Sequence, residues 1–302
     1  CDFSPCIDGE VIYVGEWGSN PRALALNKTD GRIIWQFMQP ENKSWAGSPL
    51  VNGDYVYYTT YGSGVYALNK TNGDTIWHRN IGELLCSAAY HNGVIFVSAF
   101  MPAGQYAFNA TTGEEKWHVN YGPSWESSPV VYDGMIIQVT FETKSLSNSS
   151  YGRKLQFRRD VYSVCVLNET SGELIRKFEN KGGPNTPLIH NGRILIPDDD
   201  HRIWAYNLNT GIKLWNTVRF YNETLLEQKL WVTTFPAKNA GPQDITTWSE
   251  DFTYCSPAGS GGAIYYQSLD GIFYVINQTN GRIRWSYPLN GRGFGSPSIG
   301  DG

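Results

Sequence analysis

The chain has 302 residues, of which 41% are hydrophobic and only 17% are charged, while aromatic residues reach 14% and glycine occurs 32 times. Many aromatic side chains and glycines with few charges argue against a helical bundle or disorder and favour short strands joined by tight turns. The net charge of −4 argues against a general nucleic-acid-binding protein, and no apolar run approaches the roughly 18 residues of a transmembrane segment.

One phrase, Ala-Leu-Asn-Lys-Thr-Asp-Gly followed four residues later by Trp, recurs along the chain with small changes. Its asparagines are Asn27, Asn69, Asn109, Asn168, Asn207 and Asn277. Its tryptophans are Trp35, Trp77, Trp117, Trp215 and Trp285, and Arg176 takes this place in the fourth unit. A base period of about 40 residues is that of a propeller blade with four strands.

The second unit illustrates the expected elements. Residues 48–53, 54–59, 64–68 and 75–78 are predicted as strands, and residues 69–73 as a tight turn opened by Asn and closed by Gly. A single blade cannot bury both of its faces, so each repeat tryptophan is expected to pack on the next sheet. The sequence therefore predicts an all-β propeller of six complete four-stranded antiparallel blades and the first strand of a seventh.

The whole chain, residues 1–302, is predicted to be one propeller domain. The predicted blades cover approximately residues 1–41, 42–82, 83–124, 125–182, 183–220 and 254–291, with an insertion at 221–253 and a partial blade at 292–302.

The phrase resembles the tryptophan-docking repeat of the PQQ-like β-propellers, the family of the quinoprotein dehydrogenases and of the outer-membrane assembly lipoprotein BamB. The segment from Gly262 to Ile276, followed by Trp285, is similar to a late blade of the quinoprotein alcohol dehydrogenases. This resemblance implies the fold but not an activity, because the same blades serve enzymes, scaffolds and adhesins. It leaves open a dehydrogenase that uses PQQ and calcium, for which Asp244, Trp248, Glu250 and Asp251 would be the candidate residues.

The repeat departs from the family pattern at two positions. The family's Asp is Asn in all six units, and in five of them Thr stands two places after this residue instead of three. The shift creates Asn-x-Thr, the acceptor sequence for N-linked glycans. The predicted glycosylation sites are Asn27, Asn69, Asn109, Asn168 and Asn277 in the repeat, and Asn42, Asn148 and Asn222 outside it. The other interpretation, that Asn and Thr merely favour turns, stays open.

Strand order places the repeat sequons and the long insertions on opposite faces of a propeller. The sequons fall in turns between the third and fourth strands, whereas residues 143–160 and 198–201 are expected as loops between the second and third strands. The insertion at 221–253 joins blades on that same face. Propellers often bind ligands where such loops meet the central channel.

Other residues are candidates for binding a metal ion or a ligand. Asp198, Asp199 and Asp200 could hold calcium, although a solvated acidic turn fits three adjacent carboxylates better. Five cysteines leave at least one unpaired within the chain. Exposed aromatic residues could stack on sugars, and the candidates in predicted loops are Trp17, Trp45, Trp125, Trp231 and Trp248.

The favoured hypothesis is a secreted or cell-surface N-glycosylated propeller without catalysis, which binds or assembles with proteins through its loop-rich face or an open strand edge. A filament or surface coat is one form that such assembly could take. The alternative is a PQQ- and calcium-dependent dehydrogenase of alcohols or sugars, or a fragment of one. No cofactor is expected under the favoured hypothesis.

Overall fold

A computed structural model of the chain describes residues 4–124, 126–147, 156–181, 183–198, 202–217, 256–268 and 271–289. These residues form six four-stranded sheets in which sequential strands pair antiparallel. The prediction of an all-β propeller with six complete blades is confirmed, while its partial seventh blade, residues 292–302, lies outside the described residues. The described residues contain no helix long and apolar enough to cross a membrane.

The first three blades have closely similar strand lengths. Blade one contains β1 (Cys6–Asp8), β2 (Val11–Gly15), β3 (Ala23–Asn27) and β4 (Ile33–Phe37). Blade two contains β5 (Leu50–Asn52), β6 (Tyr55–Thr60), β7 (Gly64–Asn69) and β8 (Thr75–Arg79). Blade three contains β9 (Ala89–His91), β10 (Val94–Ala99), β11 (Gly104–Asn109) and β12 (Glu115–Val119).

The remaining blades follow the same order. Blade four contains β13 (Val130–Tyr132), β14 (Met135–Ser147), β15 (Gln156–Asn168) and β16 (Leu174–Asn180). Blade five contains β17 (Leu188–His190), β18 (Arg193–Pro197), β19 (Ile203–Asn207) and β20 (Lys213–Asn216). Blade six contains β21 (Ala258–Ser260), β22 (Ala263–Gln267), β23 (Ile272–Asn277) and β24 (Ile283–Pro288).

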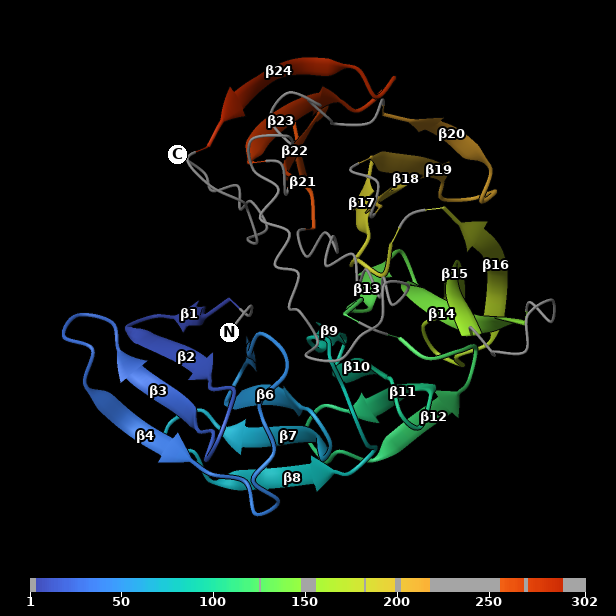
Figure 1. Cartoon of the computed structure of the whole chain (residues 1–302). Coiled ribbons are helices and arrows are strands. Elements are labelled where there is room, and N and C mark those ends of the chain that lie inside the picture. Colours follow the sequence, from blue (N-terminus) through green and yellow to red (C-terminus); the bar gives the residue numbers. More distant parts are fainter. Residues whose placement is uncertain are drawn as a thin grey trace, which may run out of the picture.

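The blades surround a common centre, with the first strand of each blade innermost and the fourth outermost (Figure 1). Consecutive innermost strands contact one another from β1 through β5, β9, β13 and β17 to β21. Blade one and blade six lie on either side of an opening in this ring (Figure 1). The described part of the molecule is therefore an open ring with two terminal blades.

Apolar packing between consecutive blades forms the core. Between blades one and two, Trp35 and Tyr13 pack with Tyr58, Tyr66 and Leu68 in one buried cluster. Comparable clusters occupy the other four junctions between consecutive blades. Burial of apolar surface drives folding, so each blade depends on its neighbours for stability.

A register shift recurs between the third and fourth strands of all six blades and fixes the position of the docking side chain. The shift follows the pair Ala25–Trp35 in blade one and the pair Ala67–Trp77 in blade two. Both alanines are fully buried, and their small side chains sit directly opposite the large indoles. Such bulges increase the local twist and re-aim a side chain, here toward the next blade.

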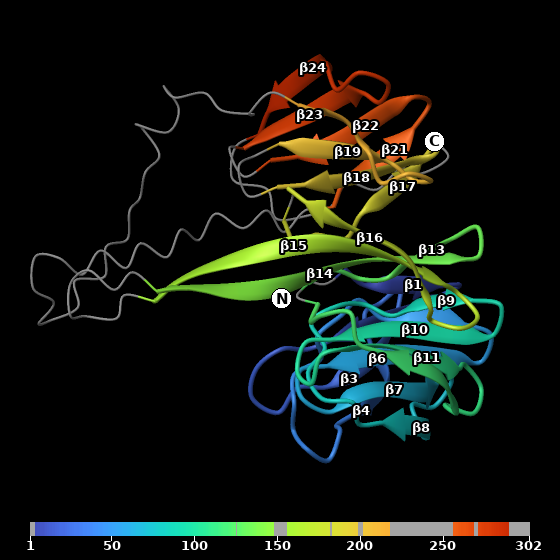
Figure 2. The ribbon, with the colours of Figure 1, turned by 90° about the vertical axis from the view of Figure 1, so that its right-hand side faces the viewer.

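Blade four differs from the prediction. Residues 143–160 were expected as a loop, but β14 continues to Ser147 and β15 begins at Gln156, and the two strands stay paired along their whole length. This part of the prediction was wrong because the polar sequence there lacks the apolar alternation that marks a half-buried strand. The β14–β15 ribbon extends well beyond the neighbouring blades (Figure 2).

Candidate functional site

Three of the repeat tryptophans hydrogen-bond to a backbone carbonyl of the next blade. The indole Nε1 of Trp35 donates to the Lys70 carbonyl at 2.8 Å, and Trp77 donates to the Ala110 carbonyl at the same distance. Trp117 donates to the Glu169 carbonyl at 2.9 Å. Each accepting residue directly follows a repeat asparagine, so the turn of one blade receives the tryptophan of the blade before it.

The glycine that closes the repeat turn is required by this docking. A Cβ on Gly73 would lie 2.7 Å from the Trp35 ring, and one on Gly113 would lie 2.6 Å from the Trp77 ring. Both glycines also have positive φ, 77° and 67°. The position therefore excludes larger residues for two reasons, a close ring and a left-handed backbone.

Arg176 replaces the tryptophan in blade four and keeps the hydrogen bond. Its guanidinium Nη1 donates to the Leu208 carbonyl at 3.0 Å, at the position equivalent to the other accepting carbonyls. Phe178 supplies the aromatic surface, because a Cβ on Gly211 would lie 2.7 Å from its ring. Two side chains thus do what one tryptophan does elsewhere.

The last repeat tryptophan is placed differently. Trp215 packs against Gly281, but its buried Nε1 has no hydrogen-bond partner among the described residues. Trp285 on β24 is 52% exposed, whereas Trp35, Trp77 and Trp117 are 6–9% exposed. Trp285 belongs to the terminal blade, and no described blade follows it around the ring.

The repeat asparagines hold their turns through the side-chain oxygen. In blade one, Oδ1 of Asn27 accepts the backbone N–H groups of Thr29 and Asp30 at 2.8 and 3.2 Å. Asn69, Asn109 and Asn168 accept the equivalent pairs of N–H groups. These are Asx turns, which use the oxygen alone. An Asp would serve equally well, so the amide nitrogen, which carries an N-linked glycan, is not needed by the turn.

The positions two and three places after the repeat asparagine have different roles in the turn. Three places after the asparagine, the side chain accepts a backbone N–H, as Thr112 accepts from Glu114 at 3.2 Å. Two places after it, the hydroxyls hydrogen-bond to no other residue that the structure describes, and all five threonines are exposed. These threonines are Thr29, Thr71, Thr111, Thr170 and Thr279. The turn therefore needs a side-chain acceptor at the later position but no threonine at the earlier one.

Of the three predicted glycosylation sites outside the repeat, one lies in the described part of the chain. Asn42 is exposed in the connection between β4 and β5, with φ of 52°. Asn148 and Asn222 lie outside the described residues.

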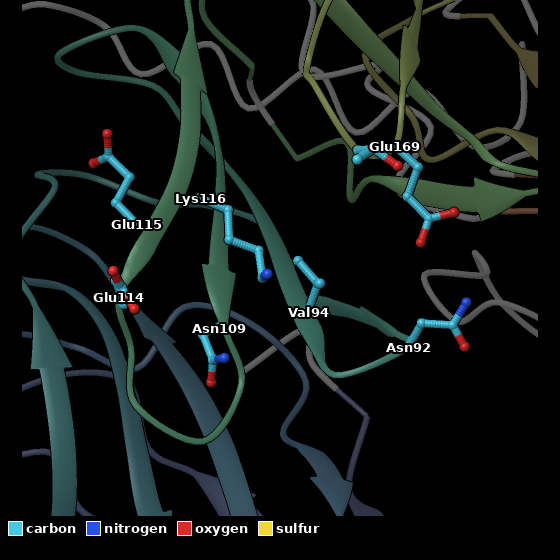
Figure 3. Close-up of a pocket in the computed structure, with 8 residues that line it drawn as sticks. Asn92, Val94, Asn109, Glu114, Glu115, Lys116 and Glu169 are labelled. Atoms are coloured by element: carbon cyan, nitrogen blue, oxygen red, sulfur yellow. The ribbon is translucent and has the colours of Figure 1, made fainter.

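A pocket of about 540 Å³ lies beside two of the sequon turns (Figure 3). Asn109 and Lys116 line it from blade three, and Glu169 lines it from the turn of blade four. Glu169 also contacts His91 of blade three, with 2.6 Å between Oε1 and Nδ1. Because Asn109 lies in the wall, a glycan on this residue would begin at the pocket.

Asp198 was expected in a solvated acidic turn or a calcium site, and the structure places it elsewhere. Its side chain is buried, Oδ1 accepts the Arg202 backbone N–H at 2.7 Å, and Oδ2 accepts Nε1 of Trp204 at 2.5 Å. The solvated-turn interpretation was wrong for this residue, because the indole six residues later draws the carboxylate inward. Asp199 and Asp200 lie outside the described residues.

The other candidate residues differ in how deeply their side chains are buried. Trp17 is 50% exposed and packs against Tyr61, but Trp45 is fully buried, so its prediction as an exposed aromatic was wrong. Trp45 lies in the connection from blade one and fills the core beneath Tyr58. Trp125, Trp231 and Trp248 lie outside the described residues. Cys6, Cys86 and Cys165 are unpaired, and burial raises the pKa of the Cys86 thiol to about 12.

A family model described as outer membrane protein assembly factor BamB matches residues 3–85 and 106–236. The chain belongs to this PQQ-like propeller family. The resemblance drawn from the repeat is thereby confirmed.

Individual relatives in this family carry different functional names. BamB of Escherichia coli strain K12 is 24% identical over 337 aligned residues, covering 92% of this chain and 84% of that protein. Tetrathionate hydrolase of Acidithiobacillus ferrooxidans is 23% identical over 297 residues, covering 91% of this chain. The chain spans 51% of the length of that hydrolase.

A solved structure of BamB from Moraxella catarrhalis has the same fold, with a TM-score of 0.69 and 16% identity. The match covers 99% of this chain and 80% of that chain. At this identity, the likeness concerns the fold alone.

The quinoprotein branch of the PQQ-like family implies PQQ and calcium, and the residues nominated for them lie outside the described part of the chain. Within the described ranges, no three His, Cys, Asp or Glu side chains are grouped so that they could hold a metal ion. Both carboxylate oxygens of the buried Asp198 already accept hydrogen bonds within the protein. Asp244, Trp248, Glu250 and Asp251 lie outside the described residues.

Proposed function

We propose that the chain is a secreted or cell-surface N-glycosylated propeller that acts as a non-catalytic binding or assembly module. Glycans on the repeat turns would cover one face, and the opposite face would meet a protein partner. The observation that carries the proposal is the five threonines whose hydroxyls the turns do not use.

Turn chemistry alone gives no reason for threonine at these positions. An exposed hydroxyl without a partner contributes little to stability, so a turn-making preference would not select it five times. Asn-x-Thr is the acceptor sequence for N-linked glycosylation, which takes place during export. Asn207 serves as an internal comparison, because it makes the same turn with Asn209 two places later.

The long β14–β15 extension projects on the opposite face, which supports a protein-binding role for that face. The β14–β15 ribbon projects on the side away from the turn between β15 and β16, where Asn168 lies (Figure 2). Projecting ribbons supply backbone and side-chain groups beyond the packed blades. The named role of the BamB relatives in assembly agrees with a partner-binding propeller.

Adjacent threonines in blade three provide a matched experiment. Thr111→Ala removes the sequon of Asn109, so we expect loss of the glycan at that site with stability unchanged, because the Thr111 hydroxyl has no described partner. Thr112→Ala keeps the sequon but removes the acceptor for Glu114, so we expect the glycan to remain and stability to fall by about 0.5–1.5 kcal/mol. Glycopeptide mass spectrometry and thermal unfolding of material from a glycosylating host measure both effects.

The opposite pattern would contradict the proposal. An unmodified Asn109 in the parent protein removes the case for glycosylation, and a large loss of stability in Thr111→Ala assigns the threonine to the turn instead. Dye reduction after addition of PQQ and Ca²⁺ would contradict the non-catalytic role and favour a dehydrogenase.

A further inference from the structure

The pocket beside the Asn109 turn has more room than the equivalent position beside Asn69. Val94 lies directly opposite Asn109 in the strand register, whereas Tyr55 lies opposite Asn69. Cross-strand neighbours have Cβ atoms about 4.5–5.5 Å apart, so their side chains share the same space. The valine therefore leaves open a volume beside Asn109 that the larger tyrosine reduces beside Asn69.

Two further positions make the Asn109 site polar where its counterpart is apolar. Lys116 of the pocket and Ile76 of blade two each directly precede a repeat tryptophan. Glu169 of the pocket and Ala110 each directly follow the repeat asparagine of the next blade. An ammonium and a carboxylate thus stand beside one sequon where the other sequon has two apolar side chains.

The glycan-bearing atom of Asn109 faces this pocket. Its Oδ1 accepts the backbone N–H groups of Thr111 and Thr112 at 2.9 and 3.0 Å, which fixes the orientation of the amide. The Nδ2 atom therefore points out of the turn, and it donates to no residue that the structure describes. Figure 3 shows this nitrogen on the side of Asn109 that faces Val94.

The pocket offers both hydrogen-bond donors and acceptors to a ligand. The Lys116 side chain turns toward Val94 (Figure 3), and its ammonium has no ion pair or hydrogen bond with a described residue. The Glu169 side chain is only 13% exposed, and His91 holds its Oε1 at 2.6 Å while Oε2 has no described partner. An ammonium donor, a fixed carboxylate acceptor and an apolar patch at Val94 match the hydroxyl groups and the C–H face of a sugar ring.

The charge of the lining favours a neutral ligand. Three carboxylates and one ammonium line the pocket, so a phosphate or another anion would be repelled. Within the described ranges, no His, Cys, Asp or Glu side chains are grouped to hold a metal ion. The volume of about 540 Å³ falls in the range of about 300–1,000 Å³ that is usual for small-molecule sites.

We infer that the first sugar of the Asn109 glycan lies in this pocket, where Nζ of Lys116 and Oε2 of Glu169 bind its polar groups. This inference rests on the proposed glycosylation and names where one glycan is held. Because Asn109 belongs to blade three and Glu169 to the turn of blade four, the sugar bridges the two blades. The Asn69 glycan has the apolar counterparts of these residues beside it and projects into solvent.

Release of the glycans from the native protein by peptide-N-glycosidase F tests the contact, because this enzyme cuts the bond between Asn and the first sugar. Protein from a eukaryotic host carries N-acetylglucosamine as that sugar, and mass spectrometry of the peptides follows each site over time. We expect release from Asn109 to be at least about tenfold slower than from Asn69, the effect of one hydrogen bond to a charged group. After denaturation, the two sites should react at equal rates.

Two variants copy blade two into the Asn109 site. Val94→Tyr fills the pocket, and Lys116→Ile removes the donor from an exposed position, so the second variant keeps the test valid if the first perturbs the fold. Both should raise the Asn109 release rate toward that of Asn69 and leave Asn69 unchanged. Lys213→Ile is the matched control, since Lys213 is an exposed lysine on the outermost strand of blade five, and it should change neither rate.

The outcomes separate this inference from the proposed function. Equal release rates at Asn109 and Asn69 in the native parent overturn the inference and leave glycosylation standing. Slow release at Asn109 that neither Val94→Tyr nor Lys116→Ile accelerates also overturns it, because the pocket is then not the cause. An Asn109 without any glycan overturns the inference and contradicts the proposed function at this site.

Discussion

Replacing Trp77 by Ala tests whether the docking tryptophans stabilise the propeller. Trp77 is 6% exposed, its ring lies 6.0 Å from Tyr57 and 6.3 Å from Phe108, and it covers Gly113. Truncation of a buried tryptophan costs about 3–5 kcal/mol. The Ala110 carbonyl would still accept from the Tyr57 hydroxyl at 3.2 Å, so little is added for an unpaired acceptor.

Trp285→Ala provides the comparison within the same repeat. About half of this side chain is already exposed, so its loss should cost no more than about 1 kcal/mol. Guanidinium unfolding followed by far-ultraviolet circular dichroism measures both variants. We expect Trp77→Ala to lose at least about 2 kcal/mol more than Trp285→Ala. Equal losses would refute the idea that docking burial stabilises the blades.

Three further outcomes follow from the described contacts. Gly113→Ala should destabilise the protein more than Gly53→Ala in thermal unfolding, because both have positive φ but only the first would place a Cβ against a ring. Burial raises the pKa of Cys86 from 9.0 to about 12, so its neutral thiol favours the folded state below pH 9, and this contribution should be lost between pH 9 and 12. Thiol titration of the native protein near pH 8 should therefore leave Cys86 unmodified until the chain unfolds, and rapid labelling would contradict its burial. Asp198→Ala should cost about 1–3 kcal/mol in chemical unfolding, since it leaves two donors without their acceptor, and an unchanged midpoint would contradict that role.

The blade architecture was predictable because it is encoded locally and repeatedly. Asn, Gly and Trp recur at fixed offsets, and each offset corresponds to a physical need, such as the side-chain oxygen for the turn and the bare Cα of Gly73 beneath the Trp35 ring. The replacement of tryptophan by Arg176 could be located by its place in the repeat. Its carbonyl contact and the contribution of Phe178 required coordinates.

The exceptions arise where tertiary contacts override local composition. Trp45 lies among polar residues and glycine, yet the space between blades one and two takes it fully into the core. Asp198 belongs to an acidic run, but Trp204 offers it a donor that no local pattern reveals. Strands β14 and β15 stay paired as far as Ser147 and Gln156, where the sequence is polar and lacks the apolar alternation of a half-buried strand, so it looked like a loop.

The distinct roles of the two turn hydroxyls were also not visible in the sequence. The motif identified the sequons, but whether the turn itself needs threonine depends on which N–H groups find acceptors. Thr112 has such a partner and Thr111 has none among the described residues, and this difference gives the glycosylation proposal its physical basis.

Site-resolved glycopeptide analysis of protein from its natural source tests the central proposal most directly. We expect sugar on Asn27, Asn69, Asn109, Asn168 and Asn277, and none on Asn207, which makes the same turn without a hydroxyl residue two places later. Unmodified asparagines at all five sequons would contradict the proposal that these turns were shaped for glycans.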